Sequence, residues 1–191
     1  QVLPMPAVTV LMSCYNASRY LSEAVESILS QTYGDYEFVV VNDGSTDHTL
    51  EIIRTYAAKD RRIRILNKAN TGLADSLNAG MRMAQGEWIA RLDADDIALP
   101  ERLAVQMAYV QSHPGTVLLG SGFIEIDASS ECLCTCRYPA EPETYMRQIM
   151  RRGRFAPHSS CLYHRATAAQ LGGYNPRIRN SEDTDLWFRL S

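Results

Sequence analysis

In the first half of the chain, short runs of apolar residues alternate with segments in which apolar residues recur every three or four positions. The short runs predict buried strands, and the spaced segments predict amphipathic helices. The predicted strands are Val8 to Cys14, Tyr36 to Val41, Ile63 to Leu66 and Trp88 to Leu92. The helices between them present Leu21, Val25, Ile28 and Leu29, then Leu50, Ile53 and Ala57, and then Leu73, Leu77 and Met81. This alternation predicts a mostly parallel sheet with helices on both faces.

The second half of the chain has a less regular pattern. Pro100 is expected to begin a helix, and Ser45 or Asp47 to cap the second helix of the first half. Ser181 is expected to cap a final helix with an acidic first turn. The remaining predicted elements are strands at Val117 to Ile126 and Cys132 to Tyr138, forming a hairpin, a helix at Glu143 to Arg152, a strand at Ser160 to His164, and a short helix ended by Gly172 and Gly173.

Polar clusters follow three of the predicted strands in the first half. They are the segments 13–16, 42–45 and 93–96. Ligands of such sheets bind beyond the carboxyl ends of the strands. The pattern therefore predicts one site that contains all three clusters.

The composition excludes several classes of protein but does not indicate a function. The 191 residues suggest one domain, and 46% apolar with 21% charged residues is typical of a globular protein. A net charge of -3 argues against a general grip on nucleic acid. The sequence shows no signal peptide and no membrane-spanning run. Five cysteines without a disulfide framework favour a reducing cytoplasm.

The segment Asp93-Ala94-Asp95-Asp96 is the strongest local signal. Three carboxylates within four residues repel one another, so their proximity is costly without a cation. Hard divalent ions take carboxylate oxygens and bridge to phosphates. A solvated acidic turn ahead of the next helix would explain the same residues, and the segment alone leaves both interpretations open.

Two further acidic positions also have a structural explanation beside a functional one. The segment Asn42 to Asp47 is typical of a turn followed by a helix cap, but Asp43 is not needed for that and can accept hydrogen bonds from a nucleobase or ribose. Glu182 and Asp183 are favoured in a first helical turn by the helix dipole. A role as a base requires the carboxylate to face the site, which spacing cannot show.

Seven ordered segments together resemble one family. The segments are VTVLMSCYN, ILSQTY, VVVNDGSTDHT, NTGLADSLNAG, GEWIARLDADDIALPERL, PHSSCLYHR and SEDTDLWFRL. With these segments, the chain is similar to the family 2 glycosyltransferases, in particular those that make bacterial O-antigen, capsule or exopolysaccharide. The resemblance implies a GT-A fold, with a mostly parallel central sheet flanked by helices and a small antiparallel addition.

The resemblance implies roles for residues of the donor pocket. Ser13 and Tyr15 match residues that line the base pocket, and Asp43 matches the aspartate that reads the uracil edge. Asp93 matches the first aspartate of the DxD motif, which contacts the ribose or the metal-bound diphosphate. Asp95 matches the second, a direct ligand of Mn²⁺ or Mg²⁺.

The resemblance also implies a catalytic base. At two further positions, His158 and Leu77, the match to the family is weaker. Asp183 matches the base of the ED motif. His158 lies where the family often has a histidine near the diphosphate, although a lone histidine is more often structural. Leu77 stands where some relatives carry an arginine, so a diphosphate contact from that position is missing.

The implied reaction is a single displacement that inverts the anomeric configuration. The partners would be a nucleotide-sugar donor and a saccharide or lipid-linked saccharide acceptor, with no nucleic acid. Two alternatives remain: a non-catalytic nucleotide-sugar-binding module, and a sugar nucleotidyltransferase, although the first strand is not followed by the glycine-rich loop of that class. A dehydrogenase is excluded because no GxGxxG follows a strand.

The domain expectation is a single unit, 1–191, with a nucleotide-binding half at 1–98 and an acceptor and catalytic-base half at 99–191. Family members continue past the position of Ser191, so we expect the second half to be truncated. The missing part would close the acceptor side or provide peripheral membrane association at the inner face of the membrane.

Overall fold

A computed structural model describes residues 5–139, 141, 143–144, 147 and 156–191. Its central sheet has the strand order β3-β2-β1-β4-β8-β5. The four strands from the first half are parallel, and β8 runs antiparallel between β4 and β5. The strands are β1 (Val8–Cys14), β2 (Tyr36–Asp43), β3 (Ile63–Lys68), β4 (Trp88–Arg91), β5 (Leu118–Leu119) and β8 (Leu162–His164). The second half of the chain thus completes the sheet that the first half begins.

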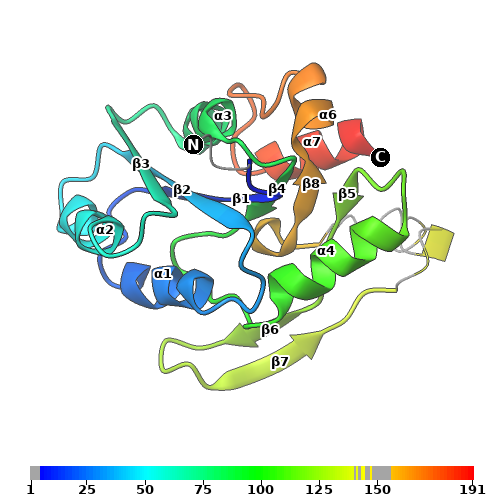
Figure 1. The fold of residues 1–191 in the computed structure, drawn as a ribbon, viewed down its shortest axis with the longest axis horizontal. Coiled ribbons are helices and arrows are strands. Elements are labelled where there is room, and N and C mark those ends of the chain that lie inside the picture. Colours follow the sequence, from blue (N-terminus) through cyan, green and yellow to red (C-terminus); the bar gives the residue numbers. More distant parts are fainter. Residues whose placement is uncertain (1–4, 140, 142, 145–146, 148–155) are drawn as a thin grey trace.

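Helices cover both faces of this sheet (Figure 1). On one face lie α1 (Leu21–Leu29), α2 (Thr49–Ala57) and α4 (Arg102–Ser112). On the other lie α3 (Leu73–Met83), α6 (Arg165–Gln170) and α7 (Glu182–Leu190). A short 3-10 helix, η1 (His158–Ser160), precedes β8. The predicted mostly parallel sheet with helices on both faces is confirmed.

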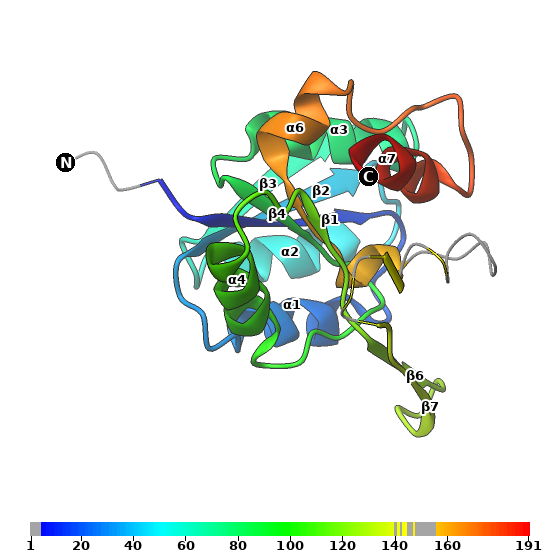
Figure 2. The same ribbon diagram turned by 90° about the vertical axis from the view of Figure 1, so that its right-hand side faces the viewer.

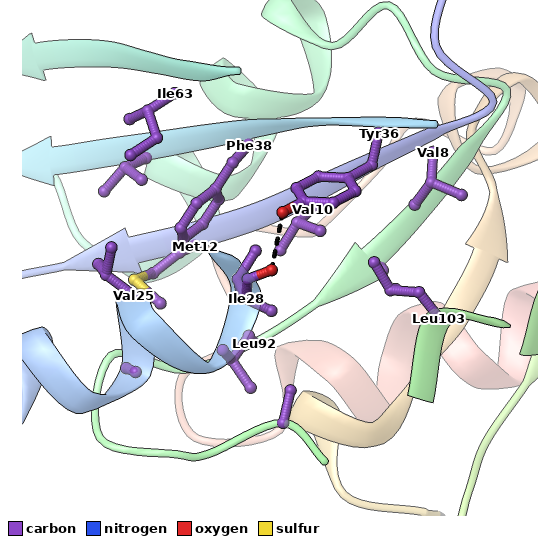
Figure 3. Close-up of a cluster of buried hydrophobic side chains, with 14 of the residues drawn as sticks. Val8, Val10, Met12, Val25, Ile28, Tyr36, Phe38, Ile63, Leu92 and Leu103 are labelled. Carbon is purple, nitrogen blue, oxygen red and sulfur yellow. Dashed lines mark hydrogen bonds between the residues drawn. The ribbon is translucent and has the colours of Figure 1, made fainter. Parts of the chain in front are cut away.

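The core is divided into two clusters by the alternation of side chains along β1. Val8, Val10 and Met12 belong to the cluster under α1, whereas Leu11 belongs to the cluster under α3. Successive side chains of a strand point to opposite faces, so a strand buried on both faces is mostly apolar, and the buried Thr9 of β1 donates a hydrogen bond to Glu37 at 2.6 Å. Figure 3 shows the first cluster, in which the Tyr36 hydroxyl donates to the Ile28 carbonyl at 2.7 Å. This packing holds β1 between the helices of the two faces.

The predicted strand at 117–126 is divided in the structure. Leu118 and Leu119 pair with β8 in the central sheet, whereas β6 (Phe123–Ile126) pairs with β7 (Cys132–Cys136) in a separate hairpin. Gly120 lies between β5 and β6, where the chain leaves the central sheet. Only a glycine fits there, because a Cβ on Gly120 would lie 2.4 Å from the Ala156 Cβ. The hairpin extends away from the body of the molecule (Figure 2).

Helix ends differ in detail from the predictions. Helix α4 begins at Arg102 rather than Pro100. The N-cap residue of α2 is His48, without a side-chain capping bond, rather than the predicted Ser45 or Asp47; Asp47, one residue earlier, accepts the Thr49 amide at 3.0 Å. Ser181 occupies the N-cap position of α7, but its hydroxyl makes no capping bond there. The predicted helix at Glu143 to Arg152 falls mostly outside the described residues.

Across the described residues, we find no helix with both the length and the apolar character that crossing a bilayer requires.

We expect the contact between α3 and β1 to be sensitive to added volume. A Cβ on Gly80 would lie 2.3 Å from Leu11 Cδ1 and 3.0 Å from Val41 Cγ2. Overpacking of a core costs about 1–3 kcal/mol, so Gly80→Val should lower the free energy of unfolding by about that amount in urea denaturation. Gly34→Ala is the control, because a Cβ there meets nothing within 4 Å. Equal stability of both variants would contradict this packing.

Candidate functional site

A pocket of about 450 Å³ lies at the carboxyl ends of β1 and β4. Ser13 and Tyr15 line it from the end of β1, and Asp93 and Asp95 line it from the loop after β4. Tyr15 is 52% exposed, so its ring is available to a ligand. The pocket is completed by Cys14, Asn16, Ala17, Arg19, Tyr20 and Ala94. Four of the predicted site residues therefore meet in one place.

A buried arginine lies beneath this pocket. Arg91, the last residue of β4, is fully buried. Its Nη1 donates to the carbonyls of Leu11 at 2.7 Å and Leu92 at 2.8 Å, and its Nη2 forms an ion pair with Asp93. A buried charge is tolerated only when it is paired and hydrogen-bonded. Arg91 therefore ties the Asp93 carboxylate to the backbone of β1.

Asp93 is held on both of its carboxylate oxygens. Oδ1 pairs with Arg91, and Oδ2 accepts the Ser159 hydroxyl at 2.8 Å. The Asp93 amide also lies 2.9 Å from the Ser159 oxygen. Burial alone would raise the pKa of Asp93, but the Arg91 charge and these hydrogen bonds bring it down to about 2. The carboxylate is thus ionised and fixed in orientation.

His158 belongs to the network below the pocket. Its Nε2 lies 3.0 Å from Arg91 Nε and 2.8 Å from the Tyr174 hydroxyl. Because an arginine can only donate, Nε2 accepts and the ring proton lies on Nδ1. Burial and the Arg91 charge hold the pKa of His158 well below 6.5. His158 does not line the pocket, so a donor contact from it remains a prediction, while its contact with Arg91 gives it a positioning role.

Asp95 differs from Asp93 in that its side chain is exposed. Within the described part of the chain, no group of three or more His, Cys, Asp or Glu side chains could hold a metal by itself. A cation bound by one or two carboxylates takes its other ligands from substrate phosphates and water. Asp95, with carboxylate oxygens facing an open pocket, fits a hard divalent ion bound in that manner.

Asp43 is buried at the end of β2 and supports a neighbouring loop. Its carboxylate pairs with Lys68 and accepts the amides of Thr71 at 3.0 Å and Gly72 at 2.9 Å. Burial raises the pKa of Asp43, but these hydrogen bonds outweigh it and lower the pKa. Asp43 does not line the pocket, so its predicted contact with uracil stays a prediction.

The loop that Asp43 supports also explains the glycine that follows it. Gly44 has a φ of 72°, which favours glycine, and a Cβ there would lie 2.7 Å from the Asn70 amide nitrogen. The turn after β2 and the loop before α3 therefore pack backbone against backbone. Leu77, in the following helix, is fully buried in the second core cluster. No charged side chain reaches the pocket from that position.

Asp183 lies in the first turn of α7, outside the residues that line the pocket. One turn later, the Trp187 ring packs edge-on against His158, with ring centroids 5.6 Å apart. Residues four apart share a face of a helix, so Asp183 lies on the face of α7 that is turned toward His158. Its charge also reaches the buried Cys161 thiol, whose pKa is raised to about 12, mainly by burial.

The three acidic residues of this turn have different partners. Asp185 pairs with Arg189 at 2.6 Å, and Glu182 accepts the Ser181 amide at 3.1 Å. Asp183 accepts the Thr184 amide on Oδ1, at 2.7 Å, and its Oδ2 has no hydrogen-bond donor among the described residues. Each of the three keeps one carboxylate oxygen without a donor among the described residues, and Asp183 is the one that shares a helix face with Trp187.

These features match a known family. The model described as Glycosyl transferase family 2 matches residues 9–172. The chain belongs to glycosyl transferase family 2. It is 39% identical over 189 residues to the putative glycosyltransferase EpsE of Bacillus subtilis, covering 97% of this chain and 66% of that protein. It is 30% identical over 198 residues to the hyaluronan synthase of Pasteurella multocida, covering 98% of this chain and 19% of the synthase.

Solved structures show the fold of this family 2 member. A mannosyltransferase from Pyrobaculum calidifontis, in complex with GDP-Man and Mn²⁺, matches with a TM-score of 0.75 and 21% identity, over 97% of this chain and 52% of the other. S. aureus TarS 1-349 in complex with UDP-GlcNAc matches with a TM-score of 0.77 and 21% identity, over 96% and 52%. The expected GT-A fold is confirmed. The chain spans less than two thirds of the length of these relatives.

Arg91 and Ser159 were not among the residues predicted for the site, although both contact Asp93 directly. The sequence does contain an indication of the role of Arg91, because this charged residue stands at the end of an apolar run that predicts a buried strand. A charge in such a strand needs a partner, and Asp93 stands two residues later. The role of Ser159 could not be predicted in this way, because its contact with Asp93 depends on the packing of η1 against the loop after β4.

The Asp93 ion pair predicts a pH dependence of stability in metal-free protein. A carboxylate with a depressed pKa stabilises the fold above its unfolded pKa, near 3.8, and this contribution is lost as the pH falls toward about 2. Asp93→Asn should therefore flatten the decline of unfolding free energy between about pH 5 and pH 2. The exposed Asp35→Asn is the control and should follow wild type. A wild-type slope in Asp93→Asn would contradict the pairing.

Proposed function

We propose that this chain is the donor-binding and catalytic part of an inverting glycosyltransferase that uses a nucleoside-diphosphate sugar. The observation that carries the proposal is the meeting of Ser13, Tyr15, Asp93 and Asp95 in one pocket of about 450 Å³. Such a pocket offers an exposed aromatic ring to a base at one side and carboxylates to a metal-bound diphosphate at the other. The family supports this choice, and the solved relatives include complexes with UDP-GlcNAc and GDP-Man.

Asp95 would hold the divalent cation, with Asp93 fixed beside it by Arg91 and Ser159. When bound, Mn²⁺ or Mg²⁺ would neutralise the charge of the diphosphate leaving group. The protein's own contribution is orientation, because a carboxylate held on both oxygens does not have to reorganise when the donor binds. The Mn²⁺ in the solved mannosyltransferase complex supports the use of a divalent cation.

Asp183 would be the base that takes the proton of the acceptor hydroxyl. Its free Oδ2 and its place on the face of α7 that is turned toward His158 support this role. A single displacement by that hydroxyl inverts the configuration of the anomeric carbon and needs no protein nucleophile. The acceptor would be a saccharide or lipid-linked saccharide of a surface polysaccharide, a proposal that the chondroitin and hyaluronan synthase relatives support.

The metal assignment predicts linked binding of nucleotide and cation. A ligand that binds only the folded state raises the melting temperature by mass action. UDP with Mn²⁺ should stabilise the protein more than UDP with a chelator, and Asp95→Asn should abolish the difference. GDP tested in the same way identifies the base preference, and Asp35→Asn serves as an exposed control. Equal stabilisation by UDP with and without Mn²⁺ would show that Asp95 is not a metal ligand.

The base assignment predicts that binding and turnover can be separated. Asp183→Asn should reduce release of nucleoside diphosphate from the preferred sugar donor by about 100- to 10,000-fold, the usual contribution of a general base. Donor affinity should stay near wild type. Glu182→Gln, in the same turn, is the matched control. Wild-type turnover in Asp183→Asn would refute the role, and donor binding without turnover in wild type would favour the non-catalytic module.

A further inference from the structure

A second cavity of about 510 Å³ adjoins the donor pocket, and we call it the apolar groove. One wall is the loop after β4, a second is α4, and the third is the β6–β7 hairpin. The hairpin stands away from the body of the molecule in Figure 2, which leaves the groove between it and the rest of the fold. Its lining is Leu92, Asp95, Asp96, Ile97, Ala98, Leu99, Glu101, Arg102, Val105, Gln106, Ser121, Gly122, Ile124, Ile126, Ser130, Ser159 and Ser160.

Five large apolar side chains from the three walls face this groove while remaining accessible to solvent. They are Ile97 (46% exposed), Leu99 (60%), Val105 (65%), Ile124 (45%) and Ile126 (39%). Exposed apolar residues scattered singly need no explanation, but a contiguous patch marks a binding surface. The groove therefore has walls suited to a hydrocarbon.

The inner end of the groove is the donor site. Asp95 lines both cavities, and Ser159, which also lines the groove, donates to the Asp93 carboxylate at 2.8 Å. A molecule lying in the groove would therefore place its inner end beside the metal-binding carboxylate. In the proposed reaction, the molecule that must reach this point from outside the donor pocket is the acceptor.

The charges around the groove limit what that acceptor carries. Three acidic residues line the groove, Asp95, Asp96 and Glu101, against one basic residue, Arg102, so the lining carries a net negative charge. An anionic segment in contact with them would be repelled. A neutral hydrocarbon chain is compatible with the apolar walls, and a hydroxyl-bearing sugar is compatible with the acidic inner end.

We propose that the apolar groove binds the hydrocarbon chain of a lipid-linked acceptor and so directs its sugar hydroxyl to the donor site. This inference rests on the proposed function and specifies its acceptor. The hydroxyl oxygen forms a bond to the anomeric carbon, and the bond from that carbon to the diphosphate breaks. The leaving diphosphate keeps the electron pair, and the hydroxyl proton passes to the Asp183 carboxylate.

The test uses the 191-residue chain with isoleucine methyl groups labelled for NMR. The probe is n-octyl β-D-glucoside below its critical micelle concentration, and methyl β-D-glucoside is the same head group without the chain. Octyl glucoside should shift the methyl signals of Ile97, Ile124 and Ile126. The buried Ile28 and Ile53 serve as internal references that should not move. Methyl glucoside should shift none of them.

A pair of variants distinguishes the groove from other exposed apolar surface. Val105→Asn, in the groove wall, should weaken octyl glucoside binding about tenfold, since burying a valine side chain is worth about 1.5 kcal/mol or more. Leu133→Asn is the control, because Leu133, in β7, is similarly exposed at 62% but does not line the groove. Farnesol in place of octyl glucoside tests whether a prenyl chain is preferred to an alkyl chain.

Three results would overturn the inference: unshifted groove isoleucines, equal loss of binding in both variants, or groove shifts that depend on protein concentration without any probe. The last would assign the groove to a second copy of the chain. Stabilisation by UDP with Mn²⁺ is measured on the same preparation. If it persists while octyl glucoside fails to bind, the acceptor assignment alone is wrong; if it is absent, the proposed function itself fails.

Discussion

The buried charge of Arg91 is the constraint on which the site depends. A guanidinium without solvent must find partners, and here it finds them on four sides: the backbone of β1, its own strand end, Asp93 and His158. These partners lie in β1, in the loop after β4 and in η1, so one side chain joins the central strands to η1. Because Trp187 packs on His158, the same network reaches α7, which carries Asp183. Removing one partner would leave the others with an uncompensated buried charge, which is costly.

This arrangement explains why the carboxylates of Asp93 and Asp95, two residues apart, differ in exposure and in their hydrogen bonds. Asp93 is ionised and fixed by Arg91 and Ser159, whereas Asp95 is exposed between the donor pocket and the apolar groove. A rigid residue beside an accessible one suits a site in which the cation arrives with its phosphate ligands. The Arg91 network holds the loop after β4 in place, and the donor pocket remains open.

Much of this could be predicted from the sequence. The apolar runs located the four parallel strands, and the polar clusters after them located a shared site, because parallel strands present their carboxyl ends at one edge. Ser13, Tyr15, Asp93 and Asp95 do meet there. The remainder depends on tertiary contacts that local pattern does not contain. The hydrogen-bond partners of Asp43 lie 25 to 29 residues away in sequence, and the orientation of Asp183 depends on the contact between Trp187 and His158. Sequence pattern likewise did not show that the chain leaves the sheet at Gly120, where Ala156 approaches too closely for a Cβ.

The central claim is that a preformed donor site lies above the Arg91 network. A crystal structure of this chain with UDP and Mn²⁺, with the metal located by anomalous scattering at the manganese edge, tests it most directly. The account predicts a manganese peak bonded to the Asp95 carboxylate and to the diphosphate, the base beside Tyr15, and the Arg91–Asp93 ion pair unchanged. A manganese site away from Asp95, or a donor that binds only after Asp93 separates from Arg91, would contradict it.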